Sequence, residues 1–187
     1  MSAHAFSILT QPGWTNSGPD HWHSHWERAH PDWQRVEQRD WERPQRDEWV
    51  QTLCAAIAAA PHPVVVLAHS IGVATVVHAA PLARRRIAGA LLVAPADVDV
   101  PQVAPEIRSF APLPLGRLPF PSLLFASRDD TWCTYERACV LAEAWGSRVI
   151  DAGTAGHLHT DAGYGPWPEG LAMLKAFLSA LAAGDGG

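Results

Sequence analysis

The stretch PVVVLAHSIGVATVVHAA, residues 63–80, decides the fold of this chain. Its first part, PVVVLA (63–68), is rich in β-branched residues and unbroken by polar ones, which is typical of a strand buried on both faces of a parallel sheet. Its last part, Val73–Ala80, consists mainly of small residues and predicts a helix. A buried strand that runs directly into a helix is the unit from which parallel sheets are built, so we expect an α/β protein.

Similar units recur along the chain. Further strands are expected at AFSILT (5–10), IAGALLVA (87–94), PSLLFA (121–126) and RVIDA (148–152), and a short one at RVEQRDW (35–41). Helices are expected from Pro44 to Ala60, Thr134 to Trp145 and Trp167 to Ala182, with a helical turn or two around 21–29 and a long excursion at 97–118. This alternation predicts a single three-layer domain, residues 1–183, with a mostly parallel sheet of about six strands. Residues 184–187 are expected to form a disordered tail.

The composition favours a globular protein that binds neither nucleic acids nor membranes. Of the 187 residues, 48% are hydrophobic and 18% are charged, and the net charge is −5. Nucleic acids and anionic membrane surfaces both attract basic partners, so this acidic balance argues against them. No apolar run approaches the roughly 18 residues of a spanning helix, and Met1–Gln11 lack the pattern of a secretion signal. We therefore expect a soluble, cytoplasmic protein.

Neither the aromatic residues nor the histidines and cysteines predict a cofactor. Six of the nine tryptophans lie between Trp14 and Trp49, and such rings form packing surfaces more often than ligand-binding walls. His21, His23 and His25 alternate, but no cysteine or acidic residue completes the pattern of a zinc site. The three cysteines have no paired spacing and are expected to be reduced thiols. We expect neither a metal nor a cofactor.

The five residues AHSIG, 68–72, match the G-x-S-x-G nucleophile elbow, with Ala68 in place of the first glycine. In this motif a sharp turn between strand and helix holds the serine in a strained conformation with its Oγ exposed. The strand and helix expected on either side of Ser70 are the context that the motif requires. The simpler alternative is that Ser70 caps the helix. We favour a nucleophile, with the Ile71 N–H as an oxyanion donor.

A nucleophilic serine in such a sheet needs an acid and then a histidine on later loops at the same edge. Asp129 and Asp130 follow the strand expected at 121–126, and only one of them can face an imidazole. Spacing alone does not choose between them. His157 and His159 follow the strand expected at 148–152, and His157 is favoured as the base because a glycine precedes it.

The loop after the first expected strand supplies a second candidate oxyanion donor. Gly13 lets the backbone approach a substrate there, and the Trp14 N–H is the natural donor, although a plain turn would explain the same residues equally well. The substrate pocket is expected to include Gly13, His69, Trp132 and part of the 97–118 excursion.

Five ordered motifs resemble a known family. They are PGWTNSGPDHW (12–22), RVEQRDWERP (35–44), LAHSIG (67–72), ASRDDTWC (126–133) and AGHLHTDAGYGPWPEG (155–170). Together they are similar to the small serine hydrolases related to retinoblastoma-binding protein 9, in particular their bacterial members. The resemblance runs over nearly the whole chain and implies an α/β-hydrolase fold without an elaborate lid.

The resemblance also chooses between the open alternatives. The acid loop of that family reads S-x-N-D-P, which implies that Asp130 is the acid, and its Gly-His pair implies that His157 is the base. The chain departs from the family at Ala68, at Thr131 in place of the proline, and at His159, where the family often has Asn. No departure removes a triad member.

These residues predict acyl transfer to water. Ser70 is expected to attack the carbonyl of an ester, thioester or amide while His157 takes its proton and Asp130 orients the imidazole. Small-molecule acyl substrates with small acyl groups are expected, with no nucleic-acid or membrane partner; a protein partner is possible but not indicated. The alternative is a binding or regulatory protein on a hydrolase scaffold with little or no turnover.

Overall fold

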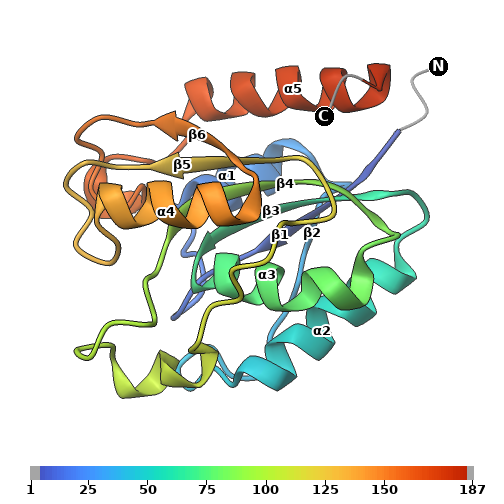
Figure 1. Ribbon diagram of the computed structural model, residues 1–187. Helices are drawn as coiled ribbons and strands as arrows, with labels where there is room; N and C mark the ends of the chain where they lie inside the picture. Colours follow the sequence, from blue (N-terminus) through green and yellow to red (C-terminus); the bar gives the residue numbers. More distant parts are fainter. Residues whose placement is uncertain (1–4, 185–187) are drawn as a thin grey trace.

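A computed structural model describes residues 5–184 as one domain around an open sheet (Figure 1). The strands are β1 Ser7–Gln11, β2 Gln34–Arg35, β3 Val64–Ser70, β4 Ile87–Pro95, β5 Ser122–Ala126 and β6 Arg148–Asp151. They are ordered β2-β1-β3-β4-β5-β6, and every neighbouring pair is parallel. The predicted parallel sheet of about six strands is confirmed.

Helices cover both faces of the sheet, which confirms the three-layer prediction. They are α1 Trp22–Ala29, α2 Arg46–Ala59, α3 Ile71–Ala83, α4 Tyr135–Trp145 and α5 Pro168–Ala183, with short 3-10 helices at Pro105–Phe110 and Thr160–Ala162. One apolar cluster joins α2, α3 and α4 to one face of the sheet, and another joins α1 and α5 to the opposite face. Within the described residues, no helix is long and apolar enough to cross a membrane.

The central strand β3 shows why its sequence is apolar throughout. Val64, Val66 and Ala68 belong to the cluster under α2 and α3, whereas Val65 and Leu67 belong to the cluster under α1 and α5. All five side chains are fully buried. A strand buried on both faces cannot alternate apolar and polar residues, so the unbroken run is a direct consequence of its central position.

Five of the nine tryptophans are buried in the core, namely Trp22, Trp26, Trp49, Trp145 and Trp167, as expected for rings that form packing surfaces. Trp22, Trp26, Trp49 and Trp145 are among the largest fully buried side chains. The indole N–H groups of Trp22 and Trp145 donate to the carbonyls of Leu158 and Pro114.

Several predicted element boundaries differ from the structure by two or three residues, and the strand expected at 35–41 differs by more. The strand expected at 35–41 has only two residues, Gln34–Arg35. Further along, the Asp40 carboxylate turns the chain by accepting hydrogen bonds from the Glu42 and Arg43 N–H groups at 3.0 and 2.9 Å. The helix expected from Pro44 begins at Arg46. Of the predicted tail, 184–187, the part after Gly184 lies outside the described residues.

Candidate active site

Ser70 is held in a strained backbone conformation between β3 and α3. Its φ of 57° and ψ of −124° lie where an L-residue is disfavoured. Such strain costs about 1–3 kcal/mol and persists only where the surrounding structure enforces it. The result is the sharp strand-to-helix turn that the AHSIG motif predicts, and Ile71 begins α3 directly beside the serine.

Close backbone packing enforces this turn. A Cβ added at Gly72 would come within 2.3 Å of the Gln11 carbonyl oxygen and 2.7 Å of the Pro12 carbonyl oxygen. A Cβ added at Gly13 would come within 2.8 Å of the Ser70 Cβ. The loop after β1 therefore lies against the elbow, and only glycine fits at both contact points. Ala68, in place of the first glycine of the motif, is accommodated and fully buried.

A continuous set of hydrogen bonds links Ser70 to His157 and Asp130. The Ser70 Oγ lies 2.9 Å from His157 Nε2, and His157 Nδ1 lies 2.9 and 3.0 Å from the two carboxylate oxygens of Asp130. The carboxylate favours the tautomer with hydrogen on Nδ1, which leaves Nε2 free to accept the serine proton. Ser70 is the last residue of β3, whereas Asp130 and His157 lie in the loops after β5 and β6, and these strands end on the left in Figure 1.

The two rejected candidates have other partners. Asp129 accepts hydrogen bonds from the Ser127 hydroxyl at 2.7 Å and the Gly156 N–H at 2.8 Å, and these bonds lower the pKa of its carboxyl. It therefore ties the acid loop to the histidine loop. His159 caps the 3-10 helix at Thr160–Ala162 by accepting from the Asp161 N–H at 3.2 Å. In the described part of the chain, the side chain that hydrogen-bonds to the Ser70 hydroxyl is His157 rather than Asp129 or His159.

His69 was expected in the pocket, and it also braces the base. Its Nε2 lies 2.8 Å from the backbone carbonyl oxygen of His157. Burial, as the largest cause, holds the pKa of His69 well below its ordinary value, so the ring is neutral and Nε2–H donates. This bond joins the residue before the nucleophile to the residue expected to act as its base.

Two further histidines belong to the same cluster and were not predicted as site residues. His23 bonds through Nδ1 to the Ser17 hydroxyl and through Nε2 to the Leu67 carbonyl of β3. The ring of His21 contacts the rings of both His23 and His69, with centroid distances of 5.1 and 4.9 Å. The alternation of histidines was visible in the sequence, but their partners lie on distant elements and gave no local signal.

Ser70 opens onto a cavity of about 330 Å³, called here the Ser70 cavity. Its walls include the predicted Trp14, His69, Ile71 and Trp132, together with His21, Ile107 and His159. Trp14 and Trp132 meet edge to face with ring centroids 6.3 Å apart. Ile107 comes from the 97–118 excursion, as expected, whereas Gly13 lies against Ser70 without lining the cavity. The roles of the Ile71 and Trp14 N–H groups as oxyanion donors stay predictions.

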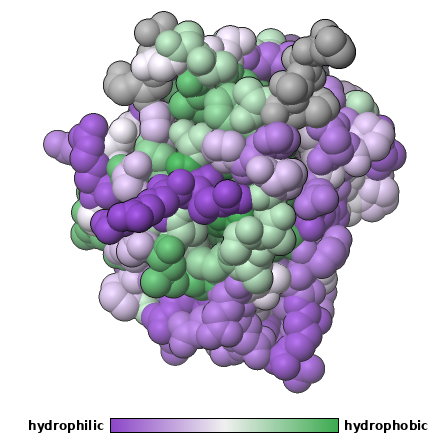
Figure 2. All heavy atoms as spheres, turned by 90° about the vertical axis from the view of Figure 1, so that its right-hand side faces the viewer, coloured by the Kyte–Doolittle hydropathy of each residue, from purple (hydrophilic) through white to green (hydrophobic). Residues whose placement is uncertain are grey.

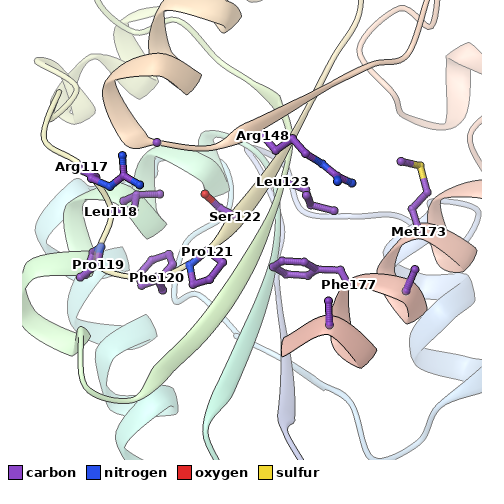
Figure 3. Close-up of a pocket in the computed structure, with 13 residues that line it drawn as sticks. Arg117, Leu118, Pro119, Phe120, Pro121, Ser122, Leu123, Arg148, Met173 and Phe177 are labelled. Carbon is purple, nitrogen blue, oxygen red and sulfur yellow. The ribbon is translucent and has the colours of Figure 1, made fainter. Parts of the chain in front are cut away.

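A larger cavity, of about 570 Å³, lies at the other edge of the sheet. It is lined by Ser122 and Arg148, where β5 and β6 begin, and by residues of α5, and it is called here the amino-end cavity. Figure 3 shows Phe177 extending from α5 toward Pro121. In Figure 2, which faces this edge, apolar surface gathers in the middle of the face between polar regions. None of Ser70, Asp130 and His157 is among its lining residues.

Comparisons with known proteins were made on both sequence and structure. The profile of the serine hydrolase family matches residues 8–176. A protein described as a YdeN-like hydrolase from Pectobacterium atrosepticum superposes with a TM-score of 0.85 at 35% identity, over 94% of this chain and 92% of that one. The ydeN gene product of B. subtilis has a TM-score of 0.71 at 17% identity, over 93% and 99% of the two chains. Est1E from Butyrivibrio proteoclasticus has a TM-score of 0.70 at 11% identity, over 97% and 90%.

A search of curated proteins returned no match. The link to retinoblastoma-binding protein 9 stays a resemblance, because none of the three proteins reported above carries that name. The family match covers most of the chain, and the YdeN-like protein from Pectobacterium atrosepticum aligns along nearly its whole length. The chain therefore belongs to the serine hydrolase family, on the fold of the α/β hydrolases.

Proposed function

We propose that this protein hydrolyses a carboxylic ester, or a related thioester or amide, through an acyl-enzyme on Ser70. The observation that carries this proposal is the hydrogen-bonded chain from the Ser70 Oγ through His157 to Asp130, with serine–histidine and histidine–aspartate distances of 2.9 Å. A serine hydroxyl is a weak nucleophile unless an adjacent base takes its proton. His157 supplies that base, and buried Asp130 stabilises the imidazolium that forms.

The reaction then has two steps. In the first, Ser70 Oγ bonds to the carbonyl carbon, its proton passes to His157 Nε2, and the collapsing tetrahedral intermediate releases the alcohol with that proton. In the second, His157 takes a proton from water, whose oxygen attacks the acyl carbon, and the carboxylic acid leaves as Ser70 recovers its hydrogen. The N–H groups of Ile71 and Trp14 are the proposed donors to the oxyanion in both steps.

The Ser70 cavity supports compact substrates. Its volume of about 330 Å³ is walled by the rings of Trp14 and Trp132, and these leave little space for a long chain. We expect acetyl and butyryl esters to be cleaved faster than long-chain esters. Faster hydrolysis of long-chain p-nitrophenyl esters would overturn this preference.

A fluorophosphonate probe tests the proposal directly. The probe should label the wild-type protein covalently, and Ser70→Ala should abolish labelling. Ser122→Ala is the matched control, because Ser122 lines the amino-end cavity and its hydroxyl bonds to the Ser147 hydroxyl rather than to a base. An unlabelled wild type would favour the alternative, a binding or regulatory protein on a hydrolase scaffold.

A further inference from the structure

We propose that His21 is a substrate-binding residue whose Nε2–H donates a hydrogen bond to an additional oxygen of the substrate, outside the scissile ester group. The inference rests on the proposed ester hydrolysis and narrows its substrate class. His21 lines the Ser70 cavity together with Ser70 and His157. Its ring contacts His69, which in turn contacts His157, with ring centroids 4.9 Å apart in both pairs.

The contacts of His21 fix where its proton sits. As the N-cap of α1, its Nδ1 accepts a hydrogen bond from the His23 N–H at 3.2 Å, so Nδ1 carries no hydrogen. Burial, followed by the nearby His159 and Arg35, lowers the pKa of His21 to about 3. The ring is therefore neutral at physiological pH, and its one hydrogen is on Nε2. His21 presents a donor, not a cation.

That donor has no acceptor among residues 5–184. His21 is only 5% exposed, and Nε2 itself is buried. The other buried histidines of the cluster differ: His23 bonds through both ring nitrogens, and His69 Nε2 bonds to the His157 carbonyl. Buried donors are almost always satisfied in folded proteins. Because His21 lines the reaction cavity, we assign its unsatisfied donor to a bond that a ligand completes.

The chemistry of this donor restricts the ligand. A neutral N–H favours a neutral acceptor such as a hydroxyl, ether or keto oxygen, whereas a carboxylate would need a charged partner when buried. Trp14, Ile107 and Trp132 form the apolar part of the remaining wall, and Thr15, Asn16 and His159 form its polar part. The substrate class that His21 selects is a compact ester with a further acceptor oxygen, carried on either its acyl or its alcohol part.

Two pairs of esters of equal length separate these positions. For the acyl part, p-nitrophenyl methoxyacetate is compared with p-nitrophenyl butyrate; for the alcohol part, 2-methoxyethyl butyrate is compared with n-butyl butyrate. In each pair an ether oxygen replaces one CH₂ group. Because the ether also changes intrinsic reactivity, the quantity measured is the ratio of kcat/KM between wild type and variant for each ester.

Two variants separate the donor from the cap. His21→Asn keeps a side-chain oxygen that caps helices well but lacks the distant N–H. His21→Gln places an amide N–H near the position of Nε2. We expect His21→Asn to lower kcat/KM about five- to tenfold more for the ether ester than for its hydrocarbon partner in one pair. His21→Gln should recover part of that difference.

An equal loss for both members of both pairs would overturn the proposal, because His21 would then only order α1 or hold a water. Fluorophosphonate labelling distinguishes failure of the His21 proposal from failure of the proposed hydrolysis. If the wild type is labelled at Ser70 but the variants do not discriminate between ether and hydrocarbon esters, only the role of His21 is refuted. An NMR measurement on the wild-type protein provides a second test. The ¹⁵N resonance of His21 Nε2 should shift in a phosphonyl adduct that carries a methoxyalkyl chain relative to the alkyl adduct, and an unchanged resonance counts against the proposal.

Discussion

The two edges of the sheet carry cavities that differ in size and in chemistry. The Ser70 cavity, where the strands end, measures about 330 Å³ and contains a serine bonded to a histidine. The amino-end cavity, where the strands begin, measures about 570 Å³, and its serine, Ser122, bonds only to another serine hydroxyl. The comparison shows that the larger of these two cavities is not the one that contains the hydrogen-bonded serine and histidine. The loops that follow the strands account for this difference, because they bring distant side chains together at one edge.

Among the tests of this comparison, we expect the largest loss of activity from a substitution of Asp130. Asp130→Asn should lower kcat by about three to four orders of magnitude, because an amide no longer favours the His157 tautomer that can accept the serine proton. The measurement is steady-state hydrolysis of p-nitrophenyl acetate.

Asp129→Asn is the matched control for that experiment. Asp129 is adjacent in sequence, but it bonds to Ser127 and Gly156. Its loss should lower kcat less than tenfold. If the two variants lose similar activity, the assignment of the acid to Asp130 is wrong.

A smaller effect is expected from His69, which acts through another residue. His69→Phe keeps a ring of similar size but removes the 2.8 Å bond to the His157 carbonyl. We expect kcat to fall about tenfold with KM nearly unchanged, since a displaced base slows proton transfer more than substrate binding. Kinetics on p-nitrophenyl butyrate provide both parameters.

His62→Phe is the corresponding control, because it also replaces a histidine with phenylalanine but at an exposed position. Its activity should match wild type. A rise in KM without a fall in kcat for His69→Phe would instead indicate that His69 contacts substrate and does not position the base.

The parts of the molecule that the sequence predicted are those encoded locally. The strand at Val64–Ser70 and the elbow at Ser70 depend on neighbouring residues, so pattern and motif sufficed. The strand expected at 35–41 is wrong beyond Arg35, where the Gln38 amide bonds to the Gln11 side chain and the Trp49 carbonyl and Asp40 then turns the chain. A β-prone pattern contains no information about such tertiary partners.

The same limit explains what was missed in the site. Spacing indicated the two loops whose side chains the structure joins to Ser70 by hydrogen bonds, but it could not choose Asp130 over Asp129, since both follow the same strand. The bond from His69 to His157 spans 88 residues. The unpaired nitrogen of His21 depends on what surrounds it in space. No local pattern reports contacts of this kind.

The smallest change in activity is expected from a substitution in the amino-end cavity, which should have no part in the reaction. Ala176→Met places a longer apolar side chain in the wall of this cavity. β5, whose five residues span about 15 Å, separates the cavity from the loop that holds Asp130, so kcat/KM on p-nitrophenyl butyrate should change less than twofold. Chemical denaturation measured alongside reports whether the fold tolerates the added volume. A tenfold loss of activity in a variant that unfolds like wild type would mean that the larger cavity communicates with Ser70, and the contrast between the two edges would no longer hold.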